Sequence, residues 1–210
     1  MKKITVSSIA ALIVFATSAP MAIADDAEPA PRAFEEFPDA LGVFFGLASG
    51  MGLSYHSWLP DTPRSGIQVA AGVLYSPDAA NDIFWGSVLD YTVGLEYQYS
   101  VFGEDFVSWL SGLLYLWGGI AHYGFIEQIV VQDAVYTDDY DLVSETVYGA
   151  GPYTPTITIG IGIGVEVILF RHFSFPIEVG YVATYNLIAD TFLAGFNVTL
   201  TPQGGGRYRF

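Results

Sequence analysis

The sequence predicts an all-β protein, an eight-stranded antiparallel transmembrane β-barrel, and three observations support this fold class. Residues alternate with a period of two in several segments, most clearly in 156–167, where Ile or Val stands at odd positions and Thr, Gly or Glu at even positions. Such alternation places the two sets on opposite faces of a strand. Only 14% of the residues are charged and 16% are aromatic, whereas average soluble domains carry about 25% charged residues. An apolar face opposite a small or polar face is typical of barrels that turn their apolar face to lipid.

Composition and net charge exclude several classes of function. The chain has 22 acidic residues, seven basic residues and a formal net charge of −15, whereas a general nucleic-acid binder needs a basic surface. It has no Cys, which excludes disulfides, thiolate metal sites and Cys nucleophiles. The alternative to a membrane barrel is a secreted soluble β-protein with its apolar face inside.

The chain divides into three parts. Residues 1–24 begin with two Lys, continue with an apolar run and end in the cleavage pattern Ala22–Ala24, which predicts a secretory signal peptide. Its removal leaves five Arg against 22 acidic residues, a net charge of −17; an uncleaved anchor is the alternative. Residues 25–39 are acidic, contain three Pro and are expected to form an exposed periplasmic linker. Residues 40–210 are expected to form the outer-membrane barrel.

Strands follow one another along residues 40–210 with turn residues between them. The first boundary, near Ala48–Gly50, separates two short strands; a single strand over 41–58 would reduce the number to seven. Later strands repeat the alternation, as in 92–101 and 177–184. The eight expected strands cover approximately 41–48, 50–58, 66–76, 88–101, 106–124, 154–170, 174–186 and 190–210.

The lengths of the connections orient the barrel. Short turns are expected at Phe102–Asp105 and Phe170–Phe173, whereas the segments on the other side are longer and more polar, above all 127–153. Bacterial outer-membrane barrels have short periplasmic turns and longer outer loops. We therefore place the short turns, both termini and every Arg at the periplasmic end.

The end of the chain carries a recognisable pattern, polar-x-Gly-x-x-aromatic-x-aromatic, at Gln203, Gly205, Tyr208 and Phe210. With this pattern, residues 40–210 resemble the small eight-stranded outer-membrane proteins, such as the membrane domain of outer-membrane protein A. The resemblance implies an assembly signal that the barrel assembly machinery reads in the last strand. The alternative for the end of the chain is a Gly-rich tail that follows a strand ending near Leu200.

The resemblance also sets the expected role. It implies an integral outer-membrane protein with a structural, surface-interaction or small-ligand role, surrounded by outer-membrane lipid, without enzyme activity or cofactor. We expect a monomer. An eight-stranded barrel has an interior that side chains fill or that holds one small ligand, so a wide porin channel is not expected. A narrow channel for small or hydrophobic solutes is the first alternative function.

A polar network is predicted inside the barrel. If Tyr208 and Phe210 face lipid, the residues that alternate with them face the lumen, and acidic residues of three other strands do the same. Buried carboxylates need a partner or water, so we expect an Arg/Glu network that closes the periplasmic half of the lumen. Solvated charges at a rim are the alternative. The predicted network consists of Glu96, Glu166, Glu178, Arg207 and Arg209.

A catalytic site is the second alternative. His172-Phe173-Ser174 followed by Glu178 resembles the His-x-Ser and Glu of a barrel deacylase that acts on lipid A, in which His would be the base and Glu would orient it. The segment lies in an expected periplasmic turn, whereas lipid A lies in the outer leaflet. Phe175 also stands where that family has Asn, so a lipid A-modifying enzyme is not the favoured interpretation.

Acidic residues gather in the segment 133–145. Clustered carboxylates suit Ca²⁺ or Mg²⁺, so the segment is a candidate site for divalent cations, although the spacing is not that of an EF-hand loop and a solvated acidic loop is the favoured interpretation. The five residues are Asp133, Asp138, Asp139, Asp141 and Glu145.

Overall fold

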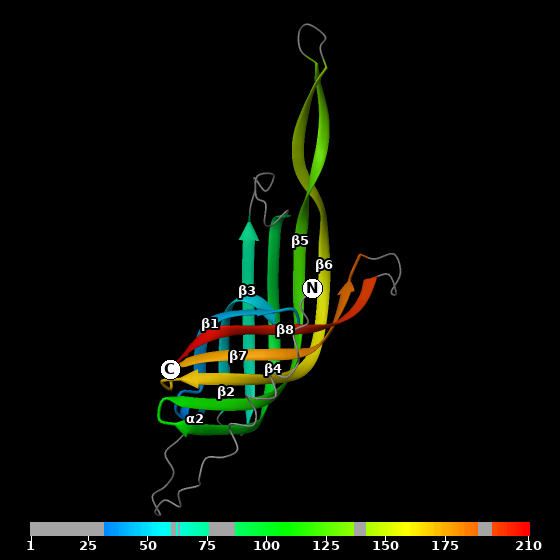
Figure 1. Cartoon of the computed structure of the whole chain (residues 1–210). Coiled ribbons are helices and arrows are strands. Elements are labelled where there is room, and N and C mark those ends of the chain that lie inside the picture. The colour runs from blue at the N-terminus through cyan, green and yellow to red at the C-terminus, as the bar shows by residue number, and fades with distance from the viewer. Residues whose placement is uncertain (1–31, 60–61, 63, 76–86, 137–141, 189–194) are drawn as a thin grey trace, which may run out of the picture. The chain divides into compact units, whose positions relative to one another are not determined.

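The chain forms a closed barrel of eight antiparallel strands in the order β1 to β8, and β8 pairs with β1 to complete the ring (Figure 1). The computed structural model describes residues 32–59, 62, 64–75, 87–136, 142–188 and 195–210. The expected signal peptide, 1–24, lies outside these ranges. The elements are α2 (Ala33–Glu36), β1 (Asp39–Gly46), β2 (Gly50–Trp58), β3 (Ser65–Tyr75), β4 (Ser87–Val107), β5 (Leu110–Tyr136), β6 (Leu142–Leu169), β7 (Phe173–Asn186) and β8 (Phe196–Arg209).

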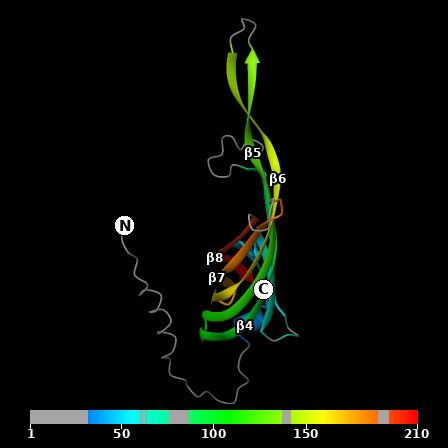
Figure 2. The same ribbon diagram turned by 90° about the vertical axis from the view of Figure 1, so that its right-hand side faces the viewer.

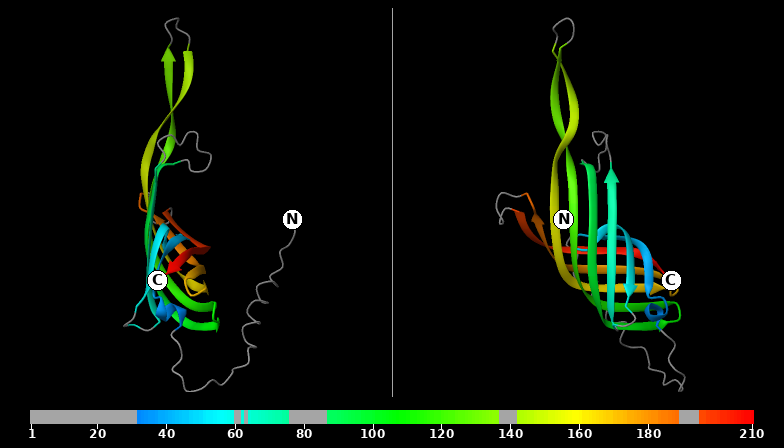
Figure 3. Two further views of the ribbon diagram at one scale, coloured as in Figure 1. Left: turned by 90° about the vertical axis from the view of Figure 1, so that its left-hand side faces the viewer. Right: turned by 180° about the vertical axis from the view of Figure 1, so that it is seen from behind.

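The predicted number of strands, their antiparallel order and the boundary inside 41–58 are confirmed. No helix within the described ranges is long and apolar enough to cross a membrane. Both described ends of the chain lie at the same end of the barrel, since the amide of Phe210 donates to Asp39 O at 2.9 Å. The last residues of β2, β4 and β6 and the first residues of β3, β5 and β7 also lie at this end, which we call the terminal end of the barrel (Figure 3).

The outward face of the barrel is apolar and the inward face is polar, as the alternation predicted. In β6, Ile159, Ile161 and Ile163 are 56%, 67% and 53% exposed, whereas Thr158 and Glu166 are buried. The β-bulge in β4 between Ser100 and Phe102 shifts this alternation by one residue. A bulge adds a residue to one strand and leaves it unpaired.

Two connections differ from the sequence-based prediction. The expected turn at Phe102–Asp105 is wrong, because β4 continues to Val107 and the bulges at its end absorb the irregular alternation. The expected polar loop 127–153 is also wrong over most of its length. The pairing of β5 with β6 continues from Gln128↔Ala150 to Tyr136↔Leu142, and the two strands extend together beyond the rest of the barrel (Figures 1 and 2). Val residues scattered among the acidic ones favour this paired ribbon.

The turn between β1 and β2, residues 47–49, lies inside the barrel. Ala48 and Ser49 are fully buried, and Thr158 Oγ1 donates to Leu47 O at 2.5 Å. Glycines on the opposite wall leave room for the turn: a Cβ at Gly94 would lie 2.2 Å from the carbonyl carbon of Ser49. A Cβ at Gly119 would lie 2.6 Å from Ala48 O, and one at Gly160 would lie 2.5 Å from Ala48 Cβ.

Because β1 and β2 are short, they cover only part of their neighbours. β1 pairs with β8 from Ala40↔Arg209 to Phe45↔Gly204, so the outer part of β8 has β7 as its described partner. The seam between β1 and β8 is therefore short and lies entirely near the terminal end.

The segment before β1 packs onto the terminal end of the barrel. Ala33 is fully buried in a cluster with Trp58, Leu113 and Ile168. Pro38 O accepts a hydrogen bond from Trp58 N at 3.0 Å. The expectation of an exposed linker is therefore wrong for Ala33, which is buried, and for Phe34, Phe37 and Pro38, which are half-buried, whereas Arg32, Glu35 and Glu36 are exposed as expected.

Candidate functional site in the barrel lumen

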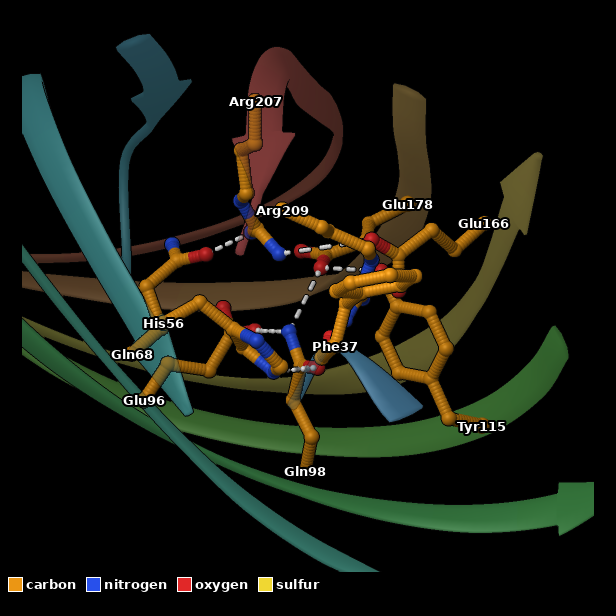
Figure 4. Close-up of polar contacts among 10 residues, drawn as sticks. All are labelled: Phe37, His56, Gln68, Glu96, Gln98, Tyr115, Glu166, Glu178, Arg207 and Arg209. Carbon is orange, nitrogen blue, oxygen red and sulfur yellow. Dashed lines mark hydrogen bonds and ion pairs between the residues drawn. The ribbon is translucent and has the colours of Figure 1, made fainter. Parts of the chain in front are cut away.

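Polar side chains from β3, β4 and β6 to β8 fill the lumen between the terminal end and the inward turn 47–49. Most of them are fully buried, because alternate residues of each strand point inward. Figure 4 shows how they converge from strands that are distant in sequence. The buried lumen residues with carboxylate, guanidinium or amide groups are Gln68, Glu96, Gln98, Glu166, Glu178, Gln203, Arg207 and Arg209.

A cluster of charges lies close to the terminal end. Arg209 Nη2 lies 2.7 Å from Glu166 Oε1, and Arg207 Nη1 lies 3.8 Å from the same oxygen. All three side chains are fully buried. Arg207 also donates to Gln68 Oε1, and Arg209 Nη1 donates to Phe37 O at 3.1 Å. One carboxylate thus holds two guanidinium groups, which we call the basal cluster.

A second cluster lies around Glu96 and Glu178, which share their hydrogen-bond donors. Gln98 Nε2 donates to Glu96 Oε1 at 2.6 Å and to Glu178 Oε1 at 3.4 Å. Gln203 Nε2 donates to Glu178 Oε2 at 2.5 Å and to Glu96 Oε2 at 3.3 Å. Tyr115 donates to Glu178 Oε1 at 2.6 Å. We call this group the upper cluster; among the described residues, no guanidinium forms an ion pair with it.

The inward turn and the upper cluster are directly connected. Ser49 donates to Glu96, and Gln203 Nε2 donates to Ser49 Oγ at 3.0 Å. Tyr123 donates to Gly46 O at 2.6 Å, next to the turn. Apolar side chains complete the filling, since Trp117 and Val182 belong to the buried cluster that packs with Ala48. The interior is therefore packed by side chains, as expected for an eight-stranded barrel.

The structure places all five residues of the predicted network in the lumen but divides them into two clusters. Glu166, Arg207 and Arg209 come together in the basal cluster. Glu96 and Glu178 belong to the upper cluster and are held by amides. The predicted network did not include Gln98, although it stands at an inward position of a clear alternation, and Gln203 was named only for the assembly signal. The sequence does not indicate that Ser49 contacts this cluster, because a residue in a turn is not part of a periodic pattern.

The four residues of the predicted assembly signal all lie in or directly after β8, which rules out the alternative of a tail after Leu200. Tyr208 and Phe210 are 48% and 55% exposed, on the outward face. Gln203 points inward and bridges the upper cluster. Gly205 pairs with Phe44 of β1, and a Cβ there would lie 2.2 Å from Val43 O.

The residues of the catalytic alternative are not assembled. His172 Nδ1 lies 2.9 Å from Arg209 O, and its ring packs 4.4 Å from Phe37 and 5.3 Å from Tyr208, measured between centroids. Ser174 is buried in the lumen. Within the described part of the chain, no hydrogen bond joins His172 to Ser174 or to Glu178.

The candidate divalent-cation site at 133–145 falls outside the residues whose side chains are described. Among the described side chains, no group of three His, Asp or Glu residues is arranged to hold a metal ion. Cation binding at this segment stays a prediction.

No protein-family model matches the chain, and no curated protein matches it in sequence. Among solved structures, the N-terminal β-barrel domain of Pseudomonas aeruginosa OprF aligns with it at 14% identity and a TM-score of 0.42. The alignment covers 82% of this chain and 95% of that one.

Proposed function

We propose that the chain is an integral outer-membrane β-barrel with a closed lumen, which anchors the β5–β6 hairpin at the cell surface and does not conduct solutes. The observation that carries this proposal is the inverted distribution of polarity. Large apolar side chains point outward on every strand, including Leu53, Ile161 and Ile177, which are 72%, 67% and 64% exposed. Polar side chains fill the interior. Such a surface is stable in lipid and is a liability in water.

The closed ring supports a place in the bilayer. In hydrocarbon, backbone groups have no water to bond with, so only helices and closed barrels span membranes. β1 pairs with β8, which closes the ring in the zone between the turn 47–49 and the terminal end.

The short connections β4–β5 and β6–β7 at the terminal end support a periplasmic location for it, because bacterial outer-membrane barrels have short periplasmic turns and longer outer loops. Aromatic residues at this end support its position at a membrane interface. Trp109 and Phe170 pack at 6.2 Å between ring centroids and are 51% and 62% exposed. Exposed aromatic residues are typical of the interface girdles of outer-membrane barrels. With the terminal end in the periplasm, the β5–β6 hairpin lies on the outer side, where it presents a paired ribbon to other molecules. Presentation of this ribbon is the surface-interaction role that we favour.

Three measurements test the proposal. Folded protein in the outer-membrane fraction should migrate differently on gels before and after heating, whereas a secreted soluble protein would appear outside the cell. Protease added to intact cells should cut within the β5–β6 hairpin and should leave the turns at the terminal end uncut. Planar bilayers should show no steady conductance; discrete conductance steps would favour the narrow channel, and a change in lipid A mass on expression would favour the enzyme.

A further inference from the structure

Two arginines of the chain differ from the other three in their ion pairs. Beyond Lys3, the chain has five Arg and no Lys. Arg207 and Arg209 are held by Glu166, and Arg171 is paired with Glu36 and Asp105. The other two, Arg32 and Arg64, form no ion pair with any described residue. Both line the same cavity.

This cavity, which we call the rim cavity, lies at the terminal end of the barrel between α2, the end of β2, the start of β3 and the last part of β4. It measures about 660 Å³, within the range of small-molecule sites. Trp58, which is 6% exposed, also lines the rim cavity. Two arginines suit an anionic group rich in acceptors, and guanidinium forks match phosphate oxygens in particular.

Hydrogen bonds to the backbone fix both arginines at the cavity. Arg32 Nη1 donates to Gly103 O on β4 at 2.9 Å, which leaves its other donors available. Arg64 has a left-handed backbone conformation with φ of 72°, and its carbonyl accepts a hydrogen bond from Ser100 N at 2.7 Å. A bulky residue keeps that conformation only where the surrounding structure requires it.

The rest of the lining indicates what else the ligand carries. The carboxylates of Glu35 and Glu104 also line the rim cavity, so its formal charge is balanced. Val101 and Phe102 line it as well and are 47% and 52% exposed on the outer surface of the barrel. The β4 bulge produces this arrangement, because it turns two consecutive apolar residues outward. The cavity thus combines hydrogen-bond donors that suit a phosphate, carboxylates that suit a cation, and an apolar border on the outward face of the barrel.

We propose that the rim cavity binds the head group of a zwitterionic aminophospholipid of the periplasmic leaflet. Arg32 and Arg64 hold the phosphate, Glu35 and Glu104 accept from the primary ammonium, and the acyl chains lie along Val101 and Phe102. The proposal rests on the outer-membrane location proposed above. It gives the barrel a lipid site at its periplasmic rim in addition to the surface hairpin.

Native mass spectrometry of the detergent-solubilised full chain tests the site. We expect phosphatidylethanolamine to stay bound to the wild-type protein, and the double variant Arg32→Gln/Arg64→Asn to bind it at least about tenfold more weakly, since it loses two charge-assisted contacts. Asn is chosen at position 64 because it tolerates a left-handed conformation. Arg171→Gln, which removes a charge at the same end outside the cavity, is the matched control and should bind like the wild type.

Binding of other ligands distinguishes a site for a lipid from a site for free phosphate. Inorganic phosphate and glycerophosphoethanolamine should bind much more weakly than the intact lipid, because they lack acyl chains. Equal binding of inorganic phosphate would overturn the lipid assignment, and stronger binding of phosphatidylglycerol would overturn the zwitterionic one. Equal loss in the Arg171→Gln control would also contradict the site. A folded, heat-modifiable barrel that retains no lipid would overturn this inference alone, whereas failure to find the chain in the outer membrane would overturn the proposed function.

Discussion

Glu96 and Glu178, on the non-adjacent strands β4 and β7, accept hydrogen bonds from the same two amides, those of Gln98 and Gln203. The lumen therefore contains two neighbouring carboxylates held by neutral donors, next to a third carboxylate held by two guanidinium groups. These two arrangements predict that the loss of one acidic charge destabilises the barrel to different degrees.

Replacement of the two kinds of carboxylate should have unequal effects. Glu166→Gln leaves two buried guanidinium groups without a carboxylate, and we expect a loss of about 3–5 kcal/mol in the free energy of unfolding. Glu178→Gln removes one of two adjacent acidic groups and keeps a polar side chain of the same shape, so its cost should stay below about 1.5 kcal/mol. Urea unfolding of the barrel in phospholipid vesicles measures both. Equal losses would show that the clusters are not electrostatically distinct.

The basal cluster should behave as a coupled unit. Arg209→Ala is expected to lower stability by about 3–5 kcal/mol, because it leaves Glu166 with the more distant Arg207 and removes the bond to Phe37 O. The double variant Arg209→Ala/Glu166→Gln should lose less than the sum of the single variants. Arg171→Ala, which breaks a partly exposed pair, should cost about 1 kcal/mol or less. An unchanged melting temperature for Arg209→Ala in detergent would contradict the network.

The inward turn predicts a difference between two adjacent glycines of β5. A Cβ at Gly119 would lie 2.6 Å from Ala48 O, whereas a Cβ at Gly118 would meet nothing closer than Ile161 Cγ2 at 3.8 Å. Gly119→Ala should therefore displace the turn and destabilise the barrel by about 1–3 kcal/mol. Gly118→Ala is the matched control, on the outward face of the same strand, and should fold with near wild-type stability. The same melting temperature for both variants would mean that the turn is not seated in the lumen.

The C-terminal pattern predicts an effect on assembly that is separate from stability. Phe210→Ala should lower the amount of folded barrel in the outer membrane of growing cells, because the last aromatic residue belongs to the expected assembly signal. Phe175→Ala removes an aromatic residue that is also exposed on the outward face, 43% against 55% for Phe210, but lies outside the signal. Quantitative gels of heated and unheated membranes compare the two. A matching decrease in both variants would attribute the effect to lost apolar surface instead.

Regular alternation made most of the barrel predictable from sequence. Strands such as β6 and β7 follow a strict period of two over many residues, so their inward residues, among them Glu166 and Glu178, could be named in advance. The same rule applied to Arg207 and Arg209, because the aromatic residues beside them fixed which face was outward. Periodicity could not reveal which of these charges would meet, since that depends on the register between strands far apart in sequence.

Features that break the period were not predictable in this way. The bulge next to Val101 shifts the alternation, and the residues after it were interpreted as a turn. The turn 47–49 enters the lumen because glycines of three other strands leave space for it, a relationship between segments that no local pattern records. The helix α2 lies in an acidic, Pro-containing segment that is typical of a linker. No pattern in this segment indicates that Ala33 is buried. In the β5–β6 hairpin, the acidic residues favoured the interpretation as a polar loop, although the backbones of the two strands pair there.

The seam between β1 and β8 is short, and it joins residues that lie at opposite ends of the barrel sequence. Bringing such distant segments together costs more chain entropy than any hairpin in the ring. Three consecutive glycines of β8, Gly204 to Gly206, lie along it and contribute no side-chain packing to the join. We therefore expect this seam to be the last part of the ring to form and the first to separate when the barrel unfolds.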